Sequence, residues 1–397
     1  MNQYRNRHRG IALTVASTLS ATMLLSACTP PMPPDVLAAL MENEITCQTG
    51  NQDVVVPEEF LGSFDIVNTT LGGVCPEQLI TEVLSDTPAG VVITTTAPTA
   101  DQRLAFEAQC TGEIITVPVF SYGVTLAYNI IGLEGLILSA NVLGEILSGS
   151  ITAWDDPAIS EINPGYDLAG LPEIAVMSVE DGSGSVEAMT TYLSNEAPES
   201  WPLGVTRTLE RGEKFPTELD VINEMIAVEG TVAVLPIVQA INNQIPMAAA
   251  KVQGEVIGPD NTQLQKVGSG AMTVAVEPNA LIATPATGGV PVEGNFDIAA
   301  SKIVLAEGQP LVGWPIMGTA HAMVCNTPED PLPLSTVQFL ERLSGQGSFE
   351  TYGLTPLPEP IRVQTFAPLQ VALSETVVPG ETVVPSETVV PGENAIE

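Results

Sequence analysis

Short apolar runs alternate with amphipathic stretches along most of this chain. Runs that are rich in β-branched residues and end in turn residues predict strands. The predicted strands are 90–94, 113–118, 125–129, 174–177, 231–236, 271–275 and 320–325. Between them, apolar residues recur three and four positions apart, which predicts helices with one apolar face. The predicted helices are 76–84, 100–109, 139–147, 186–195, 218–227, 297–305 and 335–343.

Strands that alternate with helices indicate an α/β protein. Apolar residues make up 45% of the chain and aromatic residues only 5%, so the interior must consist mainly of Val, Ile, Leu and Ala. This composition is typical of sheets that are covered by helices on both faces. The 397 residues suffice for two compact lobes, each with its own core.

The first 27 residues predict a lipoprotein signal peptide. Three arginines precede the apolar run 11–25, and residues 25–28, Leu-Ser-Ala-Cys, match a lipobox. We therefore expect cleavage before Cys28 and a lipid on Cys28 that anchors the chain at the outer face of the cytoplasmic membrane. The alternatives are an ordinary signal peptide or a short membrane helix, but the run is short for a span. A proline-rich tether over 28–45 follows.

Acidic residues dominate the charge of the chain. The net charge is −35, and it becomes −38 without residues 1–27, because that segment holds three arginines and no acid. Nucleic acid is excluded as a partner, since the chain has no basic footprint. Such a global charge also disfavours attraction of free anions, so an anion site would need locally arranged donors.

Four cysteines remain once Cys28 is lipidated. An even number in an exported chain indicates two disulfides, for which three connectivities are possible. Among these we favour Cys47 with Cys75 and Cys110 with Cys325. Buried free thiols are the alternative.

The last segment, 367–397, differs from the rest in composition. Glu-Thr-Val-Val-Pro units recur every six residues, with a proline in each unit and mutually repelling glutamates. This pattern predicts an extended, disordered tail, with a spacer or interaction segment as the functional alternative.

The segment 180–185, Glu-Asp-Gly-Ser-Gly-Ser, joins the predicted strand 174–177 to the predicted helix 186–195. Glycines allow a ligand to approach the backbone, serines add hydroxyl donors, and the start of a helix attracts negative charge. Ser183, Gly184 and Ser185 are therefore candidate anion-binding residues. An ordinary helix cap would use the same residue types.

Several further segments, in this order, resemble the PstS-type phosphate-binding proteins of bacterial phosphate ABC importers. The resemblance extends from about 114 to 358 and is most specific between 128 and 185. The segments that carry it are 117–119, 126–129, 142–159, 162–165, 174–185, 314–316 and 352–358.

This resemblance implies a fold and a domain organisation. Proteins of this type are two-lobed, periplasmic-binding-protein-like clamps (type II) with mixed sheets flanked by helices. The solute-binding domain would occupy 46–366. Lobe one would comprise 46–115 and 313–360, and lobe two 116–312.

The chain departs from the family at two ligand positions. The family has an arginine where this chain has Val179, and an Asp before an Ala-Pro pair where it has Thr96. The Asp accepts the proton of hydrogen phosphate, so both charged ligand groups are absent. Thr96 joins the candidate anion-binding residues. Arg207, Arg211 or Lys214 could supply positive charge from another direction, but a solvated loop is the better interpretation of each.

The sequence favours a binding protein over an enzyme. His321 is the one histidine after residue 27, and it lies in an apolar strand, where a core role is the better interpretation. No hydrolase elbow or metal cluster is recognisable, so we expect no cofactor and no metal. We expect a monomeric, lipid-anchored solute-binding protein that delivers phosphate or a related oxyanion to ABC importer permeases. The alternative is a related surface lipoprotein that has lost transport and acts in interaction or sensing.

Overall fold

The computed structural model describes residues 45–85, 90–259, 314–327, 329–343, 353–355, 357 and 369, and four short strands between 273 and 304. The predicted signal peptide, Cys28, nearly all of the tether and nearly all of the tail lie outside these residues.

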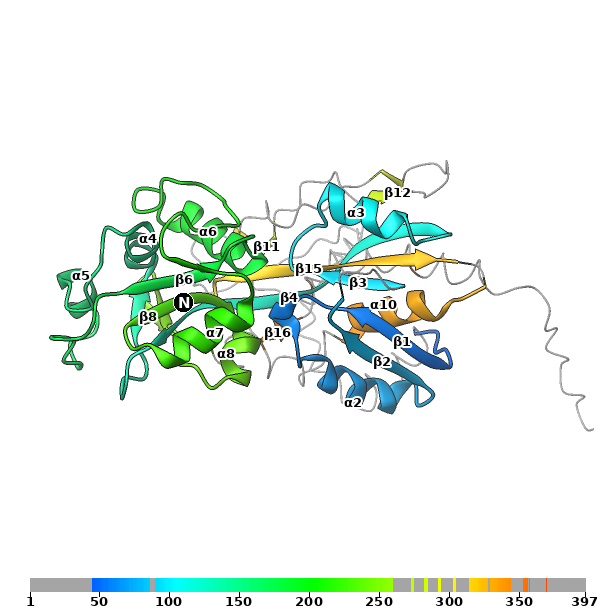
Figure 1. The fold of residues 1–397 in the computed structure, drawn as a ribbon, viewed down its shortest axis with the longest axis horizontal. Coiled ribbons are helices and arrows are strands. Elements are labelled where there is room, and N and C mark those ends of the chain that lie inside the picture. Colours follow the sequence, from blue (N-terminus) through cyan, green and yellow to red (C-terminus); the bar gives the residue numbers. More distant parts are fainter. Residues whose placement is uncertain are drawn as a thin grey trace, which may run out of the picture.

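One 11-stranded sheet runs through the described part (Figure 1). Two groups of parallel strands are joined by an antiparallel pair, β15 and β4, in its middle. The first strand group consists of β2 (Gln78–Val83), β1 (Gly50–Val55) and β3 (Val91–Thr94). The antiparallel pair is β15 (Met317–Asn326) and β4 (Glu113–Asn129). The second strand group consists of β8 (Thr231–Pro236), β6 (Ala175–Val179) and β7 (Glu213–Phe215).

Strand β4 passes from one group to the other. Residues up to Gly123 pair with β15, and Val124–Asn129 pair with β8. The predicted strands 113–118 and 125–129 are therefore the two ends of one 17-residue strand. Its register against β15 shifts beside Pro118, as expected for a residue without an N–H to donate to the ladder.

Shorter strands complete the described part. β16 (Leu354–Thr355) and β12 (Ile282–Thr284) pair with β4, and β12 also pairs with β13 (Val292–Glu293). Separate small sheets contain β5 (Ile137–Ser139), β9 (Ala249–Val252) and β10 (Glu255–Ile257), and β11 (Thr273–Val274) with β14 (Ile303–Val304). β11 lies within the predicted strand 271–275. The predicted helix 297–305 is wrong at β14, and its other residues lie outside the described ones.

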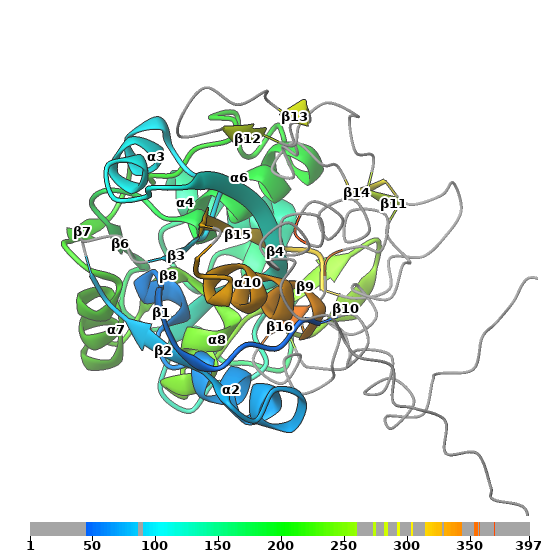
Figure 2. The same cartoon turned by 90° about the vertical axis from the view of Figure 1, so that its right-hand side faces the viewer.

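Helices flank the sheet. α3 lies on the opposite side of β15 from α2 and α10, as both views show (Figure 1, Figure 2). Five predicted helices are confirmed as α3, α4, α6, α7 and α10. The bounds are α2 (Phe64–Val74), α3 (Ala100–Glu107), α4 (Ala140–Ser148), α5 (Pro157–Ser160), α6 (Gly184–Glu196), α7 (Glu218–Ala227), α8 (Ile237–Asn242), α10 (Leu332–Leu343) and the 3₁₀ turn η1 (Glu58–Phe60).

The predicted helix 76–84 is wrong, because this segment contains strand β2. β2 pairs in parallel with β1 at one end of the main path, and its residues alternate between buried and exposed. Leu79 is 54% exposed, whereas Gln78 is fully buried. The spacing of apolar residues is helix-like here because the apolar Leu79 faces solvent and the polar Gln78 faces the interior, which breaks the alternation typical of a strand.

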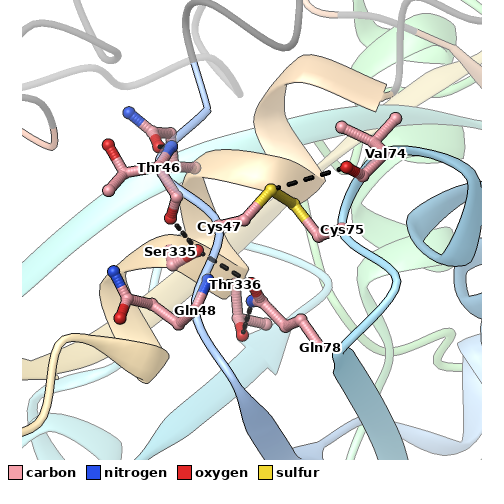
Figure 3. Close-up of a disulfide and its surroundings, with 9 residues drawn as sticks. Thr46, Cys47, Gln48, Val74, Cys75, Gln78, Ser335 and Thr336 are labelled. Carbon is pink, nitrogen blue, oxygen red and sulfur yellow. Dashed lines mark hydrogen bonds between the residues drawn. A yellow bond between two sulfur atoms is a disulfide. The ribbon is translucent and has the colours of Figure 1, made fainter.

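Both predicted disulfides are present. Cys47 bonds to Cys75 and Cys110 to Cys325, with Cα atoms 5.4 and 5.5 Å apart. Figure 3 shows the first bond beside the buried polar group around Gln78. Ser335 Oγ lies 3.0 Å from Gln78 Oε1 and Gln78 Nε2 donates to Thr336 Oγ1 at 3.1 Å, so the amide is satisfied between β2 and α10.

Candidate anion-binding site

The candidate anion site lies where β6 ends and α6 begins. Gly182 has φ +79°, and a Cβ there would lie 2.5 Å from the Arg207 carbonyl oxygen, so this position requires glycine. Ser183 is the N-cap: its Oγ accepts from the Val186 N–H at 3.1 Å, and its own N–H donates to the Arg207 oxygen at 2.9 Å. The turn is thus fixed by local bonds, and Ser183 serves as a cap.

Gly184, the first residue of α6, packs against the other strand group. A Cβ at Gly184 would lie 2.4 Å from Thr95 Cβ and 2.7 Å from the Tyr122 hydroxyl oxygen. Thr95 follows β3, and Tyr122 is a buried residue of β4 whose hydroxyl donates to the Thr95 carbonyl at 3.0 Å. The start of α6 therefore meets the end of β3, where the two strand groups join.

The carboxylate of Glu59 lies at this junction. Glu59 belongs to η1, which follows β1, and it is 9% exposed. Its carboxylate accepts a hydrogen bond from Thr95 Oγ1 at 3.4 Å. Burial raises the pKa of Glu59, and the backbone N–H groups of Glu59 and Gly184, the Thr95 hydroxyl and the charge of Arg207 oppose the rise. An acid of this chain thus lies at the start of α6.

Two further contacts hold η1 against the second strand group. Glu58 Oε2 accepts from the N–H of Glu218, at the start of α7, at 2.8 Å. Gln239 of α8 donates through Nε2 to the carbonyls of Glu58 and Leu61, at 3.0 and 3.1 Å. Glu58 therefore bonds to the N-terminus of α7, and Glu59 lies at the N-terminus of α6.

Negative charge prevails around the turn. Burial, and then the charges of Glu59 and Glu58, raise the pKa of Glu218 well above its usual range. Arg207 is the cation that lowers the pKa of Glu59, and its Nε lies 3.4 Å from Glu187 Oε2. A bound anion would thus meet several acidic side chains.

The other candidate cations serve structural contacts. Lys214 Nζ bonds to Ser178 Oγ at 2.8 Å and also to the Leu209 carbonyl. The side chain of Arg211 lies over Gly149, so closely that a Cβ there would overlap its guanidinium. Val179 packs at the edge of an apolar cluster that includes Met177. Of the three proposed replacements, Arg207 alone has a described interaction with Glu59.

The remaining candidate residues, Thr96 and Ser185, differ in burial and in hydrogen bonding. Thr96 is half-buried and its hydroxyl bonds to the Ala97 carbonyl, whereas its neighbour Thr95 faces Gly184. Ser185 is fully buried, and within the described residues its Oγ has no hydrogen-bond partner.

Glu59, Glu218, Tyr122 and Gln239 are not among the residues predicted from the sequence. A signal for Glu59 existed, because Pro57–Phe60 follows directly on the apolar run Val54–Val56. Ligands of α/β sheets bind at the carboxyl ends of parallel strands, and β1 is such a strand. β1 is absent from the predicted strands, and for that reason Glu59 is absent from the predicted site.

His321 lies in β15, opposite Thr94 and Pro118, and is buried. Burial lowers its pKa to about 4, so the ring is neutral at pH 7. Within the described ranges, no cluster of three or more His, Cys, Asp or Glu side chains is arranged for a metal ion. In the same ranges, no helix combines the length and apolarity of a membrane span.

These features define a class: a mixed α/β clamp in which two strand groups meet at the start of a helix. The chain belongs to the PBP superfamily, because the family model described as "PBP superfamily domain" matches residues 21–331. The resemblance and the two-lobed, periplasmic-binding-protein-like fold expected from the sequence are thereby confirmed.

Relatives in this family are named as binding proteins. Phosphate-binding protein PstS 2 of Mycobacterium tuberculosis (strain ATCC 25618 / H37Rv) is 24% identical over 275 residues, which cover 68% of this chain and 70% of that protein. Phosphate-binding protein PstS 3 of Mycobacterium leprae (strain TN) is 32% identical over 108 residues, or 27% of this chain and 29% of that protein.

A solved structure shares the fold. The periplasmic phosphate-binding protein PfluDING, bound with phosphate, superposes with a TM-score of 0.53. The alignment covers 80% of this chain and 93% of that one, at 15% identity. At this identity the similarity concerns the fold alone.

Proposed function

We propose that this chain is a lipid-anchored, extracytoplasmic solute-binding protein of an ABC importer, and that it binds phosphate or a related small oxyanion. It acts without catalysis, cofactor or metal, and as a monomer that docks on the importer permeases. Two findings support this: membership of the PBP superfamily, and relatives named phosphate-binding proteins.

The observation that carries the proposal is the turn Gly182–Ser185 at the junction of the two strand groups. A helix start offers backbone N–H groups and a positive dipole end to an anion. Ser185 adds a buried hydroxyl that lacks a partner within the described residues.

The proposed clamp divides as the sequence suggests, with lobe one at 46–115 and 313–360 and lobe two at 116–312. β4 supports a crossing between two lobes, because its two ends pair in different strand groups. The change of partner falls between Gly123 and Val124, so residues 116–123 lie in lobe two by number but pair with β15 of lobe one. β12 is a second exception, because it lies in lobe two by number yet pairs with Ile114 and Ile115 of lobe one.

Calorimetry with phosphate and sulfate tests the ligand. Since Val179 replaces an arginine, we expect affinity roughly ten- to a hundredfold below that of a complete site, with poor discrimination against sulfate. Ser185→Ala should weaken binding about two- to tenfold. Ser194→Ala, on the same helix with its Oγ bonded to the Thr190 carbonyl, is the matched control. Equal binding by both serine variants would remove Ser185 from the site.

The anchor is tested separately. Cys28→Ala should abolish labelling by a fatty-acid analogue and release the protein from the membrane. An unlabelled wild-type protein would refute lipid attachment, without bearing on the ligand.

A second candidate function is interaction or sensing by a surface lipoprotein that no longer transports. The acids around the turn favour it, because they oppose a bound anion. Phosphate uptake by cells that lack the protein separates the two: uptake that falls favours the importer, and unchanged uptake favours the alternative.

A further inference from the structure

The start of α6 carries an acid supplied by the chain itself. Glu59 reaches it from η1, about 125 residues earlier in the sequence. Its carboxylate accepts a hydrogen bond from Thr95 Oγ1, which packs against Gly184, and the side chain is buried, with 9% exposed. The Gly184 N–H lowers the pKa of Glu59, as it would stabilise the negative charge of an oxyanion at this turn.

A carboxylate and a phosphate present the same chemistry to such a turn. Both are anionic groups of closely spaced oxygens that accept hydrogen bonds, and both are stabilised at a helix N-terminus. Two anions in one small buried space repel each other strongly. An external anion and the ionised Glu59 carboxylate therefore exclude each other here.

We propose that Glu59 is a built-in occupant of the anion-binding turn, and that an external oxyanion binds only where Glu59 has left it. The inference deepens the proposed function and rests on it, because it concerns the same turn. It makes Glu59 the residue that sets how readily this chain accepts an anion.

The surroundings of η1 hold Glu59 in this position. Gln239 bonds to the carbonyls of Glu58, Glu59 and Leu61, and Glu58 bonds to the start of α7. These bonds link η1, which follows β1 of the first strand group, to α7 and α8 beside the second group. Hydrogen bonds between residues of the chain itself therefore connect the two groups without a ligand.

Calorimetric titration of the mature chain with phosphate tests the inference. Glu59→Ala removes the occupant, and Glu161→Ala is the matched control, since it removes an exposed acid of the same charge and leaves η1 and the turn intact. We expect Glu59→Ala to bind phosphate at least tenfold more tightly than wild type, and Glu161→Ala to bind as wild type does. If Glu59→Ala does not fold, Glu59→Gln replaces it, and a gain of at least threefold is expected because a neutral amide competes less well. Unchanged affinity in the folded variant overturns the inference.

A second measurement separates this inference from the proposed function. Acetate at matched ionic strength should raise the melting temperature of Glu59→Ala by at least 2 °C and leave wild type unchanged, since acetate replaces the missing carboxylate. If phosphate binds neither protein but acetate has this effect, the inference stands and the phosphate proposal fails. If wild type binds phosphate as tightly as Glu59→Ala, the phosphate proposal stands and the inference fails.

Discussion

Gly184 gives the sharpest test of how the two strand groups meet. Alanine at this position would place a methyl carbon 2.4 Å from Thr95 Cβ, although carbon atoms in contact lie about 3.5 to 4.0 Å apart. The end of β3 and the start of α6 must then separate by about 1 Å or more. Overpacking of this kind costs about 1 to 3 kcal/mol.

The displacement has a second cost. It displaces Thr95, whose Oγ1 donates to the buried carboxylate of Glu59, and a hydrogen bond to a charged group contributes about 1.5 to 3 kcal/mol. Because the two effects share one displacement, they do not add fully. We expect Gly184→Ala to lower the free energy of unfolding by about 3 to 5 kcal/mol.

Urea unfolding measures this loss. Three buried tryptophans, Trp154, Trp201 and Trp314, provide the fluorescence signal. Gly165→Ala is the control, because a Cβ there meets nothing within 4 Å, and it should stay within about 0.5 kcal/mol of wild type. A Gly184→Ala protein as stable as this control would refute the close approach of α6 to Thr95.

Further predictions concern the disulfides and two buried titratable groups. Replacing Cys110 and Cys325, 215 positions apart, by alanines should lower the free energy of unfolding by about 2 kcal/mol more than replacing Cys47 and Cys75, 28 positions apart, because opening the longer loop gives the unfolded chain more entropy. Equal melting temperatures of the two variants would contradict this. The raised pKa of Glu218 lowers stability as the pH rises above 4.5, so Glu218→Gln should raise the urea midpoint at pH 7.5 and change it little at pH 4; a lower midpoint at pH 7.5 would oppose this. The pKa of His321 is about 4 in the folded chain and 6.5 in the unfolded chain, so the free energy of unfolding should fall by about 3 kcal/mol as the pH falls from 6.5 to 4. His321→Leu should lose less stability over that range than wild type.

Patterns along the chain predicted elements best where local and tertiary preferences agree. α7 occupies the predicted range 218–227, because Val221, Ile222 and Met225 form one buried apolar face behind a Thr217 cap. β2 departs from the predicted helix 76–84 because its polar Gln78 is buried and its apolar Leu79 is exposed. The amide of Gln78 is satisfied by the Gln48 N–H and by Ser335 and Thr336, the last two more than 250 residues later in the chain.

The candidate site was predictable on one side only. The turn 182–185 carries its signal in consecutive residues, so its role as a helix start could be inferred locally. Glu59 and Tyr122 reach the same point from β1 and β4, and no spacing in the sequence relates them to Gly184. That meeting depends on the pairing order of the sheet, which a single sequence does not contain.

The Cys110–Cys325 bond also determines how this protein bears mechanical load. It joins the segment just before β4 to the end of β15, and the residues between its cysteines, which are 215 positions apart, include the whole second strand group. Force applied to residues before Cys110 and after Cys325 would pass through the sulfur bridge and bypass that group. Roughly 700 Å of extended chain would thereby be withheld from stretching until the bridge is reduced.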